Sequence, residues 1–135
     1  MSLSFRVYGM PVAKGSMRAF MHNGKPILTT TAKGLGEWSQ KIAAAANGRT
    51  TQMQSPARVE LTFYLPRPKT LKKSIVYPAK RPDIDKLARA VLDALTGIAW
   101  HDDAQVTYLC AMKVYASDKA PPGAQIDIEY LTSEG

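Results

Sequence analysis

Two pairs of aspartates stand out in the C-terminal half of the sequence, Asp83 with Asp85 and Asp102 with Asp103. Carboxylates are the hard oxygen ligands that Mg²⁺ prefers, together with waters and substrate phosphates. Ionised carboxylates that face one pocket repel each other, so such a set needs a shared cation or a proton. The two pairs therefore suggest a divalent-cation site. In the other reading, one residue of each pair caps local structure and its neighbour is solvated.

The first pair lies at the start of a strongly patterned helix, predicted over residues 83–96, with Gly97 as its C-terminal cap. Helical residues two positions apart point about 200° apart. Asp83 and Asp85 can therefore converge only if Asp83 belongs to the extended cap, which the preceding proline permits. The apolar stripe that predicts this helix consists of Ile84, Leu87, Ala88, Val91, Leu92 and Leu95.

Charged residues continue along one face of the same helix. Arg89 lies four residues after Asp85, and Asp93 lies four residues after Arg89, the spacing of neighbours on a helix surface. These residues form either an exposed ion-pair ladder or a functional group. In the functional reading, Arg89 stabilises negative charge on a phosphate and Asp93 orients it.

The second pair follows the helix after a short loop and precedes an apolar run. Because the loop is short, we expect Asp102 and Asp103 to lie near the first pair and to complete its metal cage. We interpret the adjacent His101 as an incidental turn residue rather than as a ligand or proton carrier.

The charge of the chain is strongly polarised. The protein has 135 residues and a formal net charge of +7. Residues 1–82 hold 14 lysines and arginines against two acids, whereas residues 83–135 hold four against nine. A basic half of this kind suggests a polyanionic partner, because phosphate neutralisation dominates non-specific affinity for nucleic acids.

Residues 66–82 concentrate this charge, with six basic residues, no acid and four prolines. The composition predicts a loop, which is either a passive linker or an arm that grips phosphates beside Asp83. Tyr77 in this loop could stack on a base or pack back on the protein. The candidate DNA-binding residues are Lys14, Arg18, Arg67, Lys69, Lys72, Lys73, Lys80, Arg81 and Lys86.

The other patterns predict an α/β (α+β) fold in one small domain, residues 1–135, with a mixed β-sheet flanked by two helices. The apolar run at 104–116 has few polar positions, so we expect it to form a central strand. Further strands are predicted over residues 4–12, 57–65 and 124–131.

Shorter signals define the rest of the N-terminal half. Thr31 is the predicted cap of a helix that buries Trp38 and Ile42 and stops at Gly48. The Asn23-Gly24 dipeptide predicts a turn within a hairpin or an irregular loop.

Composition excludes several protein classes. No apolar run approaches the roughly 20 residues of a membrane span. The N-terminus lacks the regions of a signal peptide, so we expect a cytoplasmic protein. Cys110 is the only cysteine, which excludes an intrachain disulfide and a zinc site of clustered cysteines. Because it lies in an apolar run, we expect a buried, unreactive thiol.

The segment "KRPDIDKLARAVLDAL" followed by "WHDDAQV" resembles the signature of the RusA family of Holliday junction resolvases, found in phages, prophages and their bacterial hosts. That pattern is a D-x-D at the head of a helix, a basic residue one turn on, D-A-L at the helix end, and D-D-A-Q-V. The segment "MPVAKGSMRAF" is similar to the N-terminal part of these proteins. Two positions depart from the pattern. Lys86 stands where asparagine is common, and Arg89 stands where a functionally important lysine often sits, although a guanidinium does not replace lysine as a proton donor.

The resemblance implies a homodimer that uses Mg²⁺, with Mn²⁺ as a substitute, to hydrolyse phosphodiester bonds at four-way DNA junctions in recombination and repair. It implies that Asp83, Asp85 and Asp103 are the metal-binding catalytic carboxylates, with Asp102 as an accessory ligand. We expect Arg89, Lys86 or a residue of the 66–82 loop to stabilise the developing charge, with Arg89 as the candidate catalytic residue, and residues 83–103 to form the catalytic core motif. Two alternatives stay open, a DNA-binding module without catalysis and a nuclease of the same chemistry that acts on forks or flaps.

Overall fold

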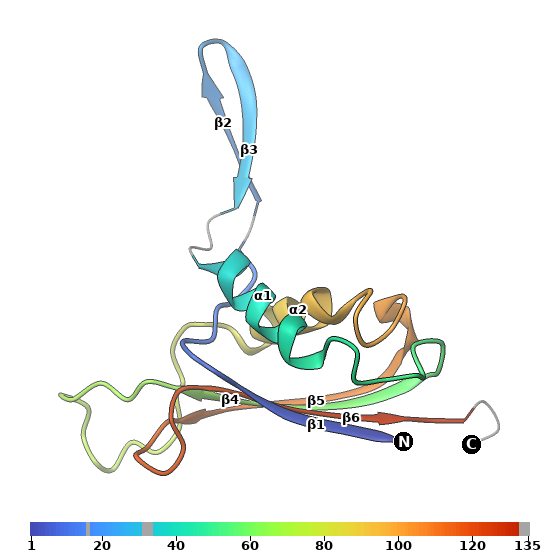
Figure 1. Ribbon diagram of the computed structural model, residues 1–135. Coiled ribbons are helices and arrows are strands. Elements are labelled where there is room, and N and C mark those ends of the chain that lie inside the picture. Colours follow the sequence, from blue (N-terminus) through green and yellow to red (C-terminus); the bar gives the residue numbers. More distant parts are fainter. Residues whose placement is uncertain (16, 31–33, 133–135) are drawn as a thin grey trace.

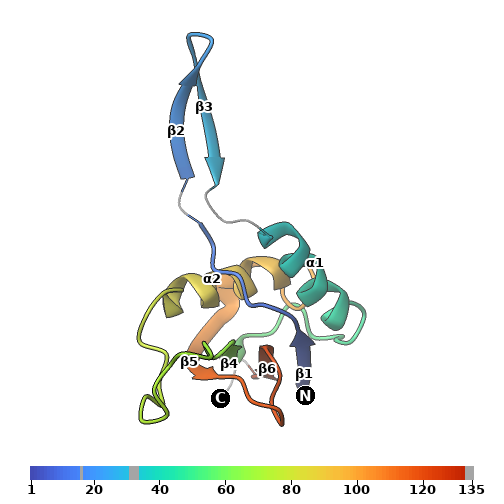
Figure 2. The same ribbon diagram turned by 90° about the vertical axis from the view of Figure 1, so that its left-hand side faces the viewer.

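The body of the protein is a four-stranded β-sheet with two helices on one face (Figure 1). A separate β-hairpin stands away from this body in both views (Figures 1 and 2). The computed structural model describes residues 1–15, 17–30 and 34–132. The elements are β1 (Ser2–Tyr8), β2 (Met17–His22), β3 (Lys25–Thr30), α1 (Leu35–Ala46), β4 (Ala57–Leu65), α2 (Ile84–Leu95), a 3₁₀ helix (Asp103–Gln105), β5 (Val106–Tyr115) and β6 (Gly123–Tyr130).

The sheet has the strand order β1-β6-β4-β5 and is mixed. β6 pairs antiparallel with both β1 and β4, whereas β4 and β5 are parallel. A parallel pair needs a crossover that returns the chain to the end where the first strand began. α2 supplies this crossover, and α1 packs beside it. The mixed sheet with two helices confirms the predicted fold class.

The core lies between the helices and one face of the sheet. Alternate residues of β4, including Val59 and Phe63, are fully buried because the strand period of two directs them toward the helices. α1 contributes Trp38 and Ile42, as its pattern predicted, and α2 buries Leu87, Val91 and Leu95 of its apolar stripe. The same face of the helices that the sequence marked as apolar therefore closes the core.

Element boundaries agree closely with the sequence patterns where the pattern is local. α2 and β4 lie where they were predicted, and β1 is shorter than the predicted strand. The Asn23-Gly24 turn joins β2 and β3 in a hairpin, with φ angles of 52° and 77°, both in the left-handed region that a tight turn of this kind requires. The predicted cap Thr31 lies outside the described residues.

The predicted central position of β5 is wrong. β5 is an edge strand that pairs only with β4. Tyr108, Leu109 and Met112 are among its exposed apolar residues, and Cys110, expected to be buried, is also exposed. An apolar run is typical of a strand that is covered on both sides, but β5 leaves much of its apolar surface exposed. No helix of the described residues is long and apolar enough to cross a membrane.

Gly123 permits the close pairing of β6 with β1. Its φ is +156°, and a Cβ at this position would collide with the carbonyl oxygen of Val7. We therefore expect Gly123→Ala to lower the free energy of unfolding by about 2 kcal/mol, the usual cost of such overpacking. Urea unfolding followed by circular dichroism measures the change.

Gly36→Ala is the matched control. Gly36 lies in α1, and a Cβ there meets nothing within 4 Å. This change should leave stability equal or raise it by about 0.5–1 kcal/mol, because glycine weakens a helix interior. Equal losses in the two variants would contradict the assignment of Gly123 as a packing constraint.

Candidate functional site

Asp83 is the N-cap of α2, and its backbone is extended, with φ −71° and ψ 136°. This is the condition under which the carboxylates of Asp83 and Asp85 can converge. The Asp83 side chain makes no capping hydrogen bond to the helix. Its carboxylate instead lies 3.6 Å from the Nζ of Lys86, and both side chains are about half exposed. The first carboxylate pair is thus available to a ligand from solvent.

Lys113 of β5 holds the segment that leads into α2. Its Nζ donates hydrogen bonds to the carbonyl oxygens of Lys80 and Pro82, each at 2.9 Å. This half-buried lysine fixes the backbone immediately before Asp83. Sequence analysis did not single it out, because a lone lysine in a strand gives no sign of a partner about 30 residues away.

A chain of charged side chains runs from the N-terminal segment to α2. The Nζ of Lys14 lies 2.5 Å from one carboxylate oxygen of Asp93, and the Nε of Arg89 lies 3.9 Å from the other. The backbone N–H of Lys14 also donates to the carbonyl oxygen of Lys86 at 3.0 Å. Asp93 therefore orients two cations, where the sequence predicted only Arg89.

These cations border a shallow cavity of about 420 Å³ beside the first carboxylate pair. Lys14, Lys86 and Arg89 line it together with Asp85, and Leu109 of β5 forms part of its wall. Three cations around a carboxylate give a surface that attracts phosphate while it keeps an oxygen ligand for a metal ion.

The second carboxylate pair is built by a capping box. Asp102 caps the short 3₁₀ helix and accepts a hydrogen bond from the N–H of Ala104 at 2.9 Å. Gln105 reaches back to accept hydrogen bonds from the N–H groups of His101 and Asp102 at 3.0 and 2.9 Å. One oxygen of Asp102 thus has a structural role, whereas Asp103 makes no side-chain hydrogen bond or ion pair to another described residue.

Gln105 also ties this turn to the loop before β4. Its Nε2 donates to the carbonyl oxygens of Met53 and Ser55 at 2.8 and 3.0 Å. All the polar atoms of this side chain are used, and together they fix the position of Asp103. Sequence analysis missed Gln105 although it stands within the recognised D-D-A-Q-V motif.

The two carboxylate pairs lie at opposite ends of the α2–β5 unit. Asp83 precedes α2, near the end of β5 where Lys113 binds Pro82, and Asp103 precedes the start of β5. The 12 residues of α2 separate the two ends by about 18 Å at 1.5 Å per residue. Among the described residues, no three Asp, Glu, His or Cys side chains are placed to share a metal ion.

The expectation that the two pairs lie close together is therefore wrong within one chain. Its physical reason is the direction of α2. The short loop of residues 97–103 brings the second pair near the end of this helix, whereas the first pair lies at its beginning. The metal-binding roles of Asp83, Asp85, Asp102 and Asp103 stay predictions.

The candidate DNA-binding residues fall into three groups. Lys69, Lys72, Lys73, Lys80 and Arg81 are exposed in the basic loop of residues 66–82. Arg67 instead shapes this loop, because its guanidinium donates to the carbonyl oxygens of Ile75 and Lys72 at 2.7 and 2.8 Å. Lys14 and Lys86 line the cavity beside α2, and the side chain of Arg18 lies outside the described part of the structure.

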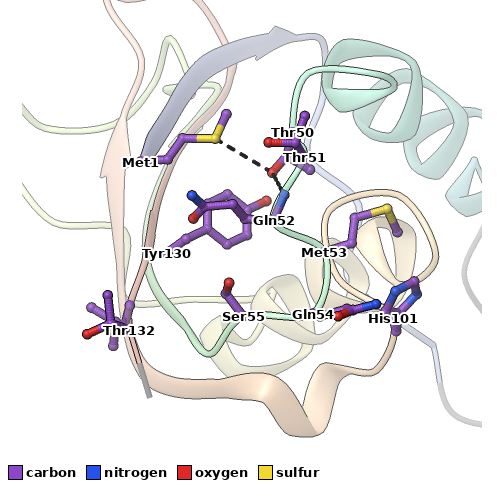
Figure 3. Close-up of a pocket in the computed structure, with 11 residues that line it drawn as sticks. Met1, Thr50, Thr51, Gln52, Met53, Gln54, Ser55, His101, Tyr130 and Thr132 are labelled. Atoms are coloured by element: carbon purple, nitrogen blue, oxygen red, sulfur yellow. Dashed lines mark hydrogen bonds between the residues drawn. The ribbon is translucent and has the colours of Figure 1, made fainter. Parts of the chain in front are cut away.

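A second cavity, of about 690 Å³, lies near the Asp102 turn (Figure 3). Residues 50–55 form much of its wall, with His101 and Tyr130, and no acid lines it. Tyr130 donates to the carbonyl oxygen of Ala99 at 2.8 Å, and burial raises the pKa of its phenol. Thr50 accepts a hydrogen bond from the N–H of Gln52 at 3.0 Å. The Thr50–Gln52 bond lies within the loop that Gln105 binds.

The profile of the family described as Endodeoxyribonuclease RusA matches residues 9–129 of the chain. The chain belongs to the RusA family. The matched range includes both carboxylate pairs and the basic loop. This membership indicates an endodeoxyribonuclease, an enzyme that hydrolyses phosphodiester bonds within DNA.

One curated relative is YqaN of Bacillus subtilis (strain 168), described as an uncharacterized protein. It is 30% identical to this RusA-family chain over 128 residues, which cover 86% of the chain and 89% of YqaN. The similarity extends over most of the length of both proteins.

The donor set at the head of α2 fits Mg²⁺ in part. Mg²⁺ keeps several waters and binds proteins through one or two carboxylates plus substrate phosphates. Asp83 and Asp85 supply carboxylates of this kind, and the Asp83 oxygens accept no capping hydrogen bond from the helix N–H groups. Any third carboxylate ligand would have to come from outside this α2 terminus.

Gln105→Glu tests the turn that positions Asp103. The new carboxylate oxygen would face the carbonyl oxygens of Met53 and Ser55, so two hydrogen bonds become repulsive contacts. We expect the free energy of unfolding to fall by about 2 kcal/mol, measured by urea denaturation at neutral pH. Gln54→Glu, at an exposed residue of the loop that Gln105 binds, should leave stability nearly unchanged. Equal effects would assign the loss to added charge instead.

Proposed function

We propose that the protein is a Mg²⁺-dependent endonuclease that resolves four-way DNA junctions by paired hydrolysis of phosphodiester bonds. The observation that carries this proposal is the carboxylate pair at the head of α2 in a RusA-family chain. Asp83 has an extended backbone, and its side chain makes no capping hydrogen bond. The cavity at the nearby Asp85 is also lined by Lys14, Lys86 and Arg89.

Each of these groups has a task in phosphodiester hydrolysis. Asp83 and Asp85 would hold the cation, with Mn²⁺ able to replace Mg²⁺. When bound there, the cation would supply polarisation of the scissile phosphate and a lowered pKa for a coordinated water. Arg89 and Lys86 donate hydrogen bonds to phosphate oxygens and stabilise the negative charge that develops there. Asp93 keeps Arg89 and Lys14 in place, and Asp102 positions Asp103 through its capping box.

Asp103 joins Asp83 and Asp85 when it comes from a second copy of the chain. One carboxylate pair lies near each end of β5, and among the described strands β5 pairs only with β4. If the β5 edges of two copies pair antiparallel about a twofold axis, the start of each strand lies beside the end of the other. Asp103 of one copy then approaches Asp83 and Asp85 of its partner, and two equal sites form.

The surface of β5 supports pairing with a second copy. Tyr108, Leu109 and Met112 are 41%, 44% and 53% exposed, although apolar side chains on an open edge strand promote unwanted association unless they are covered. A strand edge is self-complementary in the antiparallel direction, so an identical chain can cover it. Two symmetric sites suit paired cuts in a junction that is itself close to twofold symmetric.

The basic loop supports DNA as the polyanion. Five exposed cations occupy residues 66–82, directly before Asp83. Phosphates bound by this loop would be guided to the cation site, and binding would weaken steeply with salt. A nuclease of the same chemistry on forks or flaps would use the same residues, so the choice of substrate has to be measured.

The first test is cleavage of a labelled four-way junction. We expect paired nicks by the wild type in Mg²⁺ and none in EDTA. Asp83→Asn, Asp85→Asn and Asp103→Asn should each lower the cleavage rate at least about 100-fold while DNA binding persists. Asp118→Asn, at an exposed aspartate outside the site, should cut normally. Binding without cutting in Mg²⁺ or Mn²⁺ would contradict the nuclease proposal and indicate a DNA-binding module. Cutting of forks or flaps but not of the junction would contradict only the proposed substrate.

Mixed dimers test whether two copies share each site. In a dimer of Asp83→Asn with Asp103→Asn, a shared arrangement leaves one site with all its carboxylates and one site with two changes. Mixing these inactive variants should therefore restore nicking of one strand of the junction. If each site lies within one chain, every site in the mixture carries a change, and the mixture stays inactive although gel filtration shows dimers.

A further inference from the structure

The basic loop exposes three consecutive apolar side chains. Ile75, Val76 and Tyr77 are 41%, 62% and 74% exposed. Tyr77 does not pack back on the protein, which was one of its two readings from the sequence. A run of exposed apolar residues is unusual on a monomer surface away from an interaction site. This short segment, residues 75–77, is referred to below as the apolar tip.

The loop around the apolar tip is held by specific contacts. Arg67 binds the carbonyl oxygens of Lys72 and Ile75, and its guanidinium lies 5.1 Å from the ring centroid of Tyr115. Ile75 N–H also closes a turn on the carbonyl oxygen of Lys72 at 3.0 Å. On the other side, Pro78 is buried. The tip is therefore presented outward between two fixed points.

Cations flank the apolar tip on both sides. Lys72 and Lys73 precede it, Lys80 and Arg81 follow it, and all four are exposed. The loop contains no acid. An aromatic side chain among cations is the combination that binds single-stranded nucleic acids, because bases stack on the ring while the cations track the phosphates.

The position of the tip restricts where such a base can lie. Tyr77 precedes Asp83 by six residues, which span at most about 20 Å of extended chain. At about 3.4 Å of helix axis per nucleotide of a strand, the reach corresponds to about six nucleotides. A base that meets Tyr77 is thus close to the phosphate that the cation site would cut.

We propose that the apolar tip binds unpaired or unstacked DNA bases at the branch point, with Tyr77 stacked on a base and the four flanking cations on adjacent phosphates. This inference rests on the proposed function for its choice of DNA. It would let the protein distinguish branched DNA from duplex DNA, because the bases within a duplex are already stacked on each other and offer no free face to Tyr77. Ile75 and Val76 extend the apolar surface beside the ring.

Binding in Ca²⁺, without cleavage, tests the proposal on three DNAs: an intact duplex, a four-way junction and an oligo-dT strand. Tyr77→Ala should weaken binding to oligo-dT and to the junction about tenfold, as loss of one base–aromatic stack predicts, and should leave duplex binding unchanged. Tyr77→Trp should restore it. Tyr8→Ala, at another tyrosine that is 61% exposed, is the matched control and should bind like the wild type.

Photo-crosslinking gives an independent readout. A junction with 5-iodouracil at the branch should crosslink to the peptide that contains Tyr77, and the crosslink should disappear in Tyr77→Ala. Equal weakening on duplex, or no weakening on any DNA, would overturn the proposal. Binding of the wild type to anionic phospholipid vesicles that is lost in Tyr77→Ala, with DNA binding unchanged, would overturn it in favour of a membrane surface.

The outcome separates this inference from the proposed function. Junction cleavage by the wild type together with normal DNA binding by Tyr77→Ala would overturn only the role of the tip. Base-dependent binding through Tyr77 without any metal-dependent cleavage would support the tip and overturn the nuclease proposal.

Discussion

The parallel pairing of β4 with β5 is the constraint on which the arrangement of the site depends. Two consecutive parallel strands cannot be joined by a tight turn, so the chain has to cross back over the sheet. The crossover is α2, and its beginning and end therefore lie at opposite ends of β5. Asp83 is fixed to one end through the Lys113–Pro82 hydrogen bond, and Asp103 is fixed to the other through Gln105. The separation of the carboxylate pairs is a consequence of topology rather than of loop conformation.

The same topology leaves β5 at the edge of the sheet. Its partner β4 is held on the other side by β6, so the outer edge of β5 pairs with no described strand. Leu109 and Met112 of β5 are exposed. An open apolar edge strand promotes aggregation unless a partner covers it. Leu109 of this edge lines the same cavity as Asp85, so an interface at the edge would lie beside the first carboxylate pair.

The sequence predicted features that depend on local periodicity or on a short motif. The apolar stripe of α2 and the alternation in β4 identify those elements within a residue or two, and the extended cap at Asp83 follows from Pro82 and the helix start. Features that depend on distant partners were missed. The composition of residues 106–115 fits a buried strand, so only the pairing order reveals an edge. Arg67 was predicted to contact DNA because it is an arginine in a basic loop, yet its guanidinium donates to carbonyl oxygens of that loop.

The proposed division of the ligands between two copies would also solve an electrostatic problem. Three or four carboxylates gathered in one chain without a cation would repel and shift one another toward the protonated form. At opposite ends of α2 and β5 they are separated by about 18 Å, where solvent and salt screen most of the repulsion. In the proposed dimer, the folded chain would avoid this repulsion without metal, and the full ligand set would form only on assembly. Because a cation that binds the assembled site stabilises it, metal binding and dimerisation would strengthen each other.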